Sequence, residues 1–157
     1  MLARTRSLAV LSLLLVTTGA AGAAAKGSAV AHYNVGKDRL ALQGYCPVSY
    51  FQGHTRKGDA KLTAEREGVL YRFHSEEHRK QFLAEPNKFT PAYGGWCATA
   101  MAEGKKVEID PRNFKVSGGR LFLFYKSLLH DAQKDWNKDE PGHRDRADKA
   151  WKGISGE

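Results

Sequence analysis

The sequence predicts a small single domain of the α+β class, with short antiparallel strands and short helices. Strand-forming and helix-forming segments are mixed along the chain, without the regular alternation that builds a parallel sheet. The chain has 157 residues, of which 41% are hydrophobic, as is usual for a globular domain. That length suits one hydrophobic core. It excludes a TIM barrel or a two-domain dehydrogenase.

Residues 1–25 have the composition of a secretory signal peptide. Arg4 and Arg6 precede an apolar run over 8–16, and Gly and Ala fill 19–25. A positive segment, a short apolar stretch and a small-residue cleavage site are typical of such signals. The apolar stretch is short for a bilayer span, so an uncleaved anchor is the less favoured alternative. We therefore expect a periplasmic or secreted protein with no membrane span after cleavage.

A lead-in of small and polar residues over 26–37 precedes the predicted folded domain, 38–157. The segment 69–73 is rich in β-forming residues and predicts a strand. A helix is expected to start at Ser75, whose side chain can cap free backbone N–H groups, and two acidic residues follow it. Pro86 marks the expected end of this helix.

The second half of the domain contains a predicted β-hairpin. A turn or loop over 91–95 and a short helix over 97–102 come first. Strands over 113–116 and 120–125 then flank the turn 117–119, which contains two glycines. The second of these strands is almost continuously apolar, which is typical of a central strand.

Helical segments are predicted at the C-terminal end of the chain. Leu128, Leu129, Ala132 and Trp136 recur at helical spacing. A last short helix is expected over 144–151. Together these segments form a helical tail that closes the domain.

The positive charge is spread along the chain. The formal net charge is +8, and it becomes +6 without residues 1–25. Basic and acidic residues interleave over 134–149, which is the pattern of a solvated helix face. Because no basic stripe is present, we expect no nucleic-acid partner.

Cys46 and Cys97 are the two cysteines, and they are 51 positions apart. Two cysteines exclude a disulfide-dense scaffold and a metal site built from four cysteines of one chain. In an oxidising compartment the pair could form a disulfide, worth about 4 kcal/mol in chain-entropy terms. A Cys46–Cys97 disulfide is therefore one interpretation of these residues.

A metal site is the other interpretation. His74 and His78 flank the predicted cap Ser75, so their side chains can converge where the strand passes into the helix. Thiolates and imidazoles are ligands for Zn²⁺ in a tetrahedral site or for copper. The candidate ligands are Cys46, His74, His78 and Cys97. The spacing is also compatible with the absence of a metal site. In that case His74 and His78 are surface residues at the helix start, and the cysteines form a disulfide or are buried thiols.

Other residues have weaker signals. His54, next to Gly53 in a predicted loop, is a reserve ligand. The sequence has no nucleophile elbow, no phosphate loop and no telling carboxylate pair, so we do not predict an enzyme. Aromatic residues that could line a pocket are Tyr45, Tyr50, Tyr93 and Trp96.

Several segments, taken in order, resemble the exported YHS-domain proteins. The match covers Asp38 to Trp151, nearly all of the predicted mature chain. It includes the opening Gly-Tyr-Cys-Pro-Val and the Tyr-Arg-Phe-His-Ser that corresponds to the motif naming the family. The matching segments are 40–51, 71–75, Phe82, 86–89 and 93–97.

The resemblance implies metal binding, because YHS domains resemble cysteine-rich modules attached to heavy-metal transporting ATPases. The ligand positions of those modules correspond to Cys46, His74 and His78. Two of the three are His here instead of Cys, which favours zinc or copper(II) over copper(I). We therefore expect an exported copper- or zinc-binding domain without catalytic turnover. Its expected partner is a protein that donates the metal or another, unidentified protein. The alternative is a module held by the Cys46–Cys97 disulfide that binds a partner or small ligand without metal.

Overall fold

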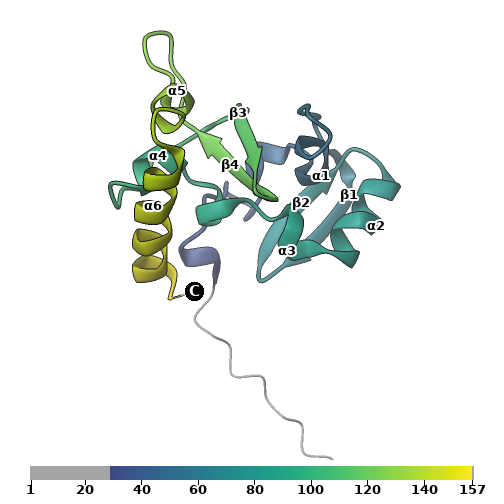
Figure 1. The fold of residues 1–157 in the computed structure, drawn as a ribbon. Coiled ribbons are helices and arrows are strands. Elements are labelled where there is room, and N and C mark those ends of the chain that lie inside the picture. Colours follow the sequence, from purple (N-terminus) through teal and green to yellow (C-terminus); the bar gives the residue numbers. More distant parts are fainter. Residues whose placement is uncertain (1–28, 157) are drawn as a thin grey trace, which may run out of the picture.

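Two antiparallel hairpins form the framework of the computed structural model, which describes residues 29–156 (Figure 1). The first hairpin joins β1 (Asp59–Arg66) to β2 (Val69–Phe73), and the second joins β3 (Asp110–Ser117) to β4 (Arg120–Phe124). The predicted α+β class with short antiparallel strands, including a C-terminal hairpin, is confirmed. The predicted signal peptide lies outside the described residues.

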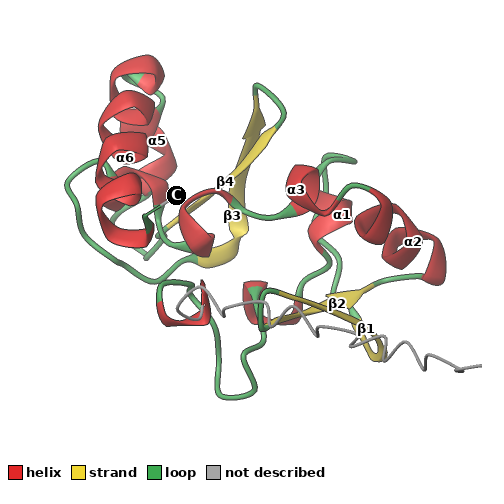
Figure 2. Ribbon diagram, turned by 90° about the horizontal axis from the view of Figure 1, so that it is seen from below, coloured by secondary structure: helices red, strands yellow, loops and turns green. Residues whose placement is uncertain are grey.

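The helices divide between the two hairpins. Figures 1 and 2 both show α1, α2 and α3 on the side of β1–β2, with α5 and α6 on the side of β3–β4. Short 3₁₀ turns connect some of these elements. The helices are α1 (Pro47–Tyr50), α2 (Glu76–Ala84), α3 (Pro86–Phe89), α4 (Ala98–Met101), α5 (Ala132–Trp136) and α6 (Glu140–Ser155), and the 3₁₀ turns are Ala29–Ala31, Leu42–Gly44 and Ala92–Gly95.

The first hairpin packs against α2 through aromatic rings. Burial alternates along β2, so Tyr71 and Phe73 face the core. Phe82 of α2 packs against both, with ring centroids 4.8 Å from Tyr71 and 5.1 Å from Phe73. The predicted cap is confirmed, because Ser75 Oγ accepts a hydrogen bond from the backbone N–H of His78 at 3.2 Å.

The apolar strand β4 belongs to a two-stranded sheet and not to the centre of a larger one. One edge pairs with β3, and single bridges link β4 to Pro91 and Cys97. Phe122 and Phe124 pack on Trp136 of α5, with ring centroids 5.1 Å and 5.7 Å away. Irregular segments and helices thus bury β4, which explains its apolar sequence.

The helix predicted from Leu128 onward is wrong in its first half, because α5 begins only at Ala132. Asp131 caps α5 by accepting a hydrogen bond from the Gln133 N–H at 3.1 Å. Before it, the chain forms a loop closed by backbone pairing of Lys126 with Asp131. The apolar spacing was misleading there, since both leucines lie in this loop.

Other differences concern elements with weak sequence signals. The sequence did not reveal β1, because half of its residues are charged and none is fully buried. Pro86 ends one helix as expected, but it also begins α3, where its fixed φ angle is tolerated. The last helix, α6, has 16 residues and is longer than predicted.

None of the helices within residues 29–156 is both long and apolar enough to cross a membrane.

Gly94 brings the lead-in and the C-terminal helix together. Its φ angle is +60°, and a Cβ atom there would lie 2.7 Å from the Trp151 ring and 3.1 Å from Tyr33 Cα. Tyr33 and Trp151 pack edge to face, with ring centroids 6.1 Å apart. Glycine therefore supplies both the backbone conformation and the space that this contact needs.

Replacing Gly94 with alanine tests this close contact. Gly104 is the matched control, because it has a φ of +70° but no heavy atom within 4 Å of the added Cβ. We expect G104A to lower the free energy of unfolding by about 1 kcal/mol through backbone strain alone. G94A should lower it by roughly 1–3 kcal/mol more, because side chains must move. Urea unfolding measures both, and equal losses would contradict the packing role of Gly94.

Candidate functional site

Cys46 and His78 meet in the interior beside the first hairpin. Cys46 directly precedes α1, and His78 lies in the first turn of α2. Because α1 packs against α2, the Cys46 sulfur lies 3.3 Å from His78 Nδ1. Cys46 is completely buried, and His78 is 8% exposed. Two of the four predicted ligands are therefore in direct contact.

The backbone around Cys46 is held by the loop that follows α1. The Cys46 N–H donates to the Arg56 carbonyl at 2.8 Å. Ser49, also fully buried, donates from Oγ to the Cys46 carbonyl at 2.7 Å and accepts from the Arg56 N–H at 3.1 Å. These bonds fix the position of the sulfur relative to α2.

The side chain of Gln52 contacts the second ring nitrogen of His78. Its amide nitrogen lies 3.1 Å from His78 Nε2. An amide nitrogen only donates, so with this side-chain orientation Nε2 is the acceptor. The proton of the neutral ring is then on Nδ1, facing the Cys46 sulfur. Gln52 was not identified from the sequence, because a glutamine six positions after a cysteine carries no recognisable signal.

Two further imidazoles lie near His78. The ring of His74 is exposed, and its centroid is 6.2 Å from that of His78. Its Nε2 accepts a hydrogen bond from Arg56 at 3.1 Å. His54 donates from Nδ1 to the Gln52 carbonyl at 3.1 Å, which leaves its Nε2 with an unused lone pair. That nitrogen is buried and has no hydrogen-bond partner.

The environment of His78 favours its neutral form. Burial lowers the pKa of His78, and nearby positive charge at His74, Arg56 and His54 lowers it further, while Glu77 opposes this. His54 is linked to His78 through Gln52, whose backbone carbonyl accepts from His54 and whose side chain contacts His78. The sequence suggested His54 only as a reserve ligand.

Cys97 lies elsewhere in the domain. It precedes α4, which packs against α5 and α6, and its N–H donates to the Val107 carbonyl at 3.0 Å. Both Cys46 and Cys97 are buried free thiols, so the disulfide considered above is not formed in this structure. Among residues 29–156, no three His, Cys, Asp or Glu side chains are placed to hold one metal ion. The four predicted ligands thus do not converge on one point.

The predicted pocket-wall residues also do not share a pocket. Tyr93 lines an open cavity of about 410 Å³ beside Arg120 and Trp151, whereas Tyr45 lines a separate groove. Tyr50 is buried and donates its hydroxyl hydrogen bond to the carbonyl of Pro111. Trp96 Nε1 donates to the carbonyl of His32 at 2.7 Å. Tyr50 and Trp96 therefore have structural contacts of their own.

The site combines one thiol, one contacting imidazole and two neighbouring imidazoles. Sulfur and imidazole nitrogen together suit soft or borderline metal ions. A cysteine beside a histidine also occurs in thiol nucleophiles, but here the sulfur is fully buried. Comparisons of the chain with models of protein families, with curated proteins and with solved structures gave no match.

Burial of both thiols predicts their reactivity. A water-soluble disulfide reagent should modify neither Cys46 nor Cys97 rapidly in the native protein, because they are 0% and 1% exposed. After denaturation without reductant, two thiols per chain should react. No reactive thiol after denaturation would instead support the disulfide, and fast reaction in the native state would contradict the burial.

The pKa of His78 predicts a dependence of stability on pH. Because it lies below the ordinary value of 6.5, the unfolded chain binds more protons than the folded protein as the pH falls below 6.5. The free energy of unfolding should therefore decrease in that direction. His78→Gln should lose less stability than the wild type between about pH 7.5 and about pH 5.5.

Chemical unfolding of the metal-free proteins at several pH values measures this difference. Leu83→Ser is the control, since Leu83 is an exposed residue of α2 that does not titrate. Its pH dependence should match that of the wild type. A His78→Gln profile parallel to the wild type would contradict the expectation.

Proposed function

We propose that this protein is an exported metal-binding domain, which binds a copper or zinc ion through Cys46 and His78 without catalytic turnover. The observation that carries the proposal is the contact of the Cys46 sulfur with His78 Nδ1, at 3.3 Å. The resemblance to YHS-domain proteins supports it, because two of the ligand positions that it implies are those of this contact. The proposed location is the periplasm or the extracellular space.

The donor chemistry fits such an ion. A thiolate is a ligand for copper and zinc, and a neutral imidazole is a ligand for both. His54 and His74 are the proposed additional ligands, each needing a side-chain rotation to join the pair. His54 is favoured as a ligand because its Nε2 is buried and has no hydrogen-bond partner. This nitrogen would lose no hydrogen bond when it binds a metal.

Gln52 and Ser49 are the proposed supporting residues. A metal on His78 Nδ1 requires the ring proton to move to Nε2, where the Gln52 side chain would have to present its oxygen instead of its nitrogen. Such outer partners fix the ring orientation of metal-binding histidines. Ser49 holds the Cys46 backbone through its bonds to Cys46 and Arg56.

Binding is favoured over turnover because the only sulfur near a histidine ring at this site is fully buried. A substrate would have to reach it through α1 and α2. The alternative function, a disulfide-stabilised module that binds a partner or small ligand, has less support because both cysteines are free thiols. Cys97 is left out of the proposed ligand set.

Metal titration of the purified metal-free protein tests the proposal. The probes are Zn²⁺, Cu²⁺ and, under reducing conditions, Cu⁺, each in competition with a chromogenic chelator. We expect one equivalent to bind, and C46A and H78A to lower the affinity at least tenfold, because each removes one of two primary ligands. H54A and H74A should show which imidazole completes the site.

Two matched variants serve as controls. C97A removes the other buried thiol, and H130A removes an exposed imidazole, so both should bind like the wild type. Circular dichroism and unfolding curves confirm that each variant is folded. The proposal is wrong if none of these ions binds, or if C46A and H78A bind the metal as tightly as C97A.

A further inference from the structure

Two leucines stand almost completely in water on the loop between β4 and α5. Leu128 is 99% exposed and Leu129 is 96% exposed, whereas the next most exposed large apolar residue in the described part of the chain, Leu83, is 51% exposed. The loop extends beyond α5, at the end of the molecule away from α2 (Figure 1). We call residues 126–131 the leucine loop.

The leucine loop is held in shape by its own hydrogen bonds. The Ser127 N–H donates to the His130 carbonyl at 2.8 Å, and the His130 N–H donates to Ser127 Oγ at 3.2 Å. Backbone pairing of Lys126 with Asp131 closes its base. The two leucines are the residues between Ser127 and His130, so this hydrogen-bonded turn holds them at the tip.

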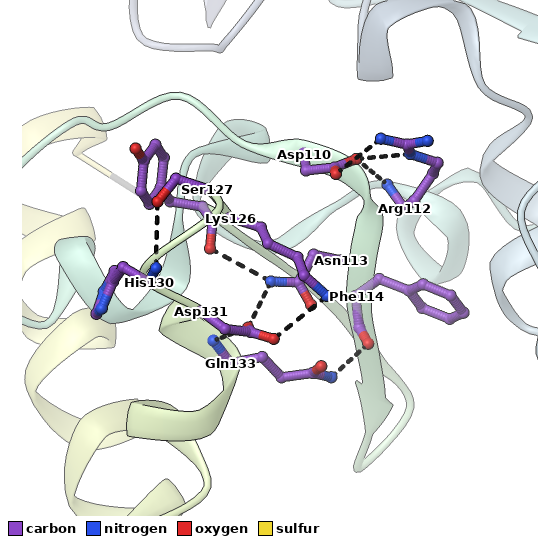
Figure 3. A network of polar contacts seen from close by, with 10 residues as sticks. Asp110, Arg112, Asn113, Phe114, Lys126, Ser127, His130, Asp131 and Gln133 are labelled. Atoms are coloured by element: carbon purple, nitrogen blue, oxygen red, sulfur yellow. Dashed lines mark hydrogen bonds and ion pairs between the residues drawn. The ribbon is translucent and has the colours of Figure 1, made fainter.

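A buried asparagine anchors the base of the loop to β3. Asn113 is 5% exposed, and its side-chain nitrogen donates to Asp131 at 2.8 Å and to the Tyr125 carbonyl at 3.3 Å (Figure 3). Asp131 in turn caps α5 through the Gln133 N–H. Gln133 also donates to the Phe114 carbonyl at 2.6 Å. This network fixes the loop to the domain.

Around the tip of the leucine loop, the lysine side chains are more exposed than the aspartate side chains that pair with them. The side chains of Lys126 and Lys138 are 51% and 74% exposed, but their partners Asp131 and Asp135 are only 17% and 36% exposed. Lys134, in α5, is also exposed. The apolar tip is therefore surrounded by exposed lysines, which we call the basic rim, and the carboxylates of Asp131 and Asp135 are less exposed than the lysines that pair with them.

We infer that the leucine loop docks the domain onto the surface of an anionic lipid bilayer. Leu128 and Leu129 would enter the boundary between headgroups and acyl chains, and Lys126, Lys134 and Lys138 would face lipid phosphates. A bilayer offers an apolar layer beneath negative charge and needs no complementary shape. A protein groove would need a fitted concave surface, whereas the rim here consists of long, flexible lysines.

This docking is independent of the proposed metal site. The leucine loop belongs to the β3–β4 half, while Cys46 and His78 belong to the half with α1 and α2 (Figures 1 and 2). A domain attached by this loop would leave α2 and its imidazoles facing away from the lipid. The two proposals can therefore fail separately.

Vesicle sedimentation of the full chain tests the inference. The vesicles contain phosphatidylcholine either alone or mixed with phosphatidylglycerol. Replacing both Leu128 and Leu129 with serine should lower the partition onto anionic vesicles at least about tenfold, because it removes two apolar side chains from the contact. L83S, the control, changes a leucine on the other half and should bind like the wild type.

Removing the lysine charges or adding salt separates the electrostatic part of vesicle binding from the apolar part. The triple variant K126Q/K134Q/K138Q, or addition of about 0.5 M salt, should weaken binding to anionic vesicles several-fold. Binding to vesicles of phosphatidylcholine alone should be weaker than to anionic vesicles and insensitive to salt. Equal binding by the serine variant and the wild type would overturn the inference.

A probe at the tip separates insertion of the loop from binding by residues 1–28. An environment-sensitive fluorophore is attached to Leu129→Cys, with Leu83→Cys as the control, since both native thiols are buried. With anionic vesicles, emission from position 129 should shift to shorter wavelength and be quenched by brominated lipids, while emission from position 83 should not change. Vesicle binding without a response at position 129 would refute docking through the loop.

Discussion

The packing of Phe82 on β2 is the interaction on which the candidate site depends. Its ring lies against Tyr71 and Phe73, which fixes α2 on the first hairpin. Ser75 starts the helix at the end of that strand, so His78 occupies a set position in the first turn. Only because α2 is held in this way does His78 reach the sulfur of Cys46, which is fixed separately before α1.

The domain has two halves with different chemistry. The half with α1, α2 and the first hairpin brings a buried thiol into contact with the imidazole of His78, and the imidazoles of His54 and His74 belong to the same half. The half with β3, β4 and α5 presents an apolar tip within a basic rim. Metal binding and attachment to a lipid surface would therefore use opposite parts of the protein. Such an arrangement would turn the half of the protein that contains the proposed metal site away from the lipid.

Much of the fold could be predicted because its signals are local. A run of β-forming residues indicated β2, the serine cap indicated the start of α2, and the glycine turn indicated the hairpin of β3 and β4. The failures have equally local causes. Half of the residues of β1 are charged and none is fully buried, so the strand lacks an apolar pattern. The apolar spacing of Leu128 and Leu129 resembles that of a helix, although the helix starts only after Asp131.

By itself, the sequence determined the α+β class, the elements with strong periodicity or caps, and a short list of thiols and imidazoles. It could not choose among the four ligands predicted from it, because distances between residues far apart in the chain arise only from packing. Tertiary structure joined Cys46 to His78 across 32 positions and placed Cys97 in the other half. It added Gln52, which contacts His78 and links it to His54, the reserve ligand of the sequence. It also turned two leucines outward, because they stand at the tip of a turn whose shape is set by backbone hydrogen bonds and by the cap at Asp131.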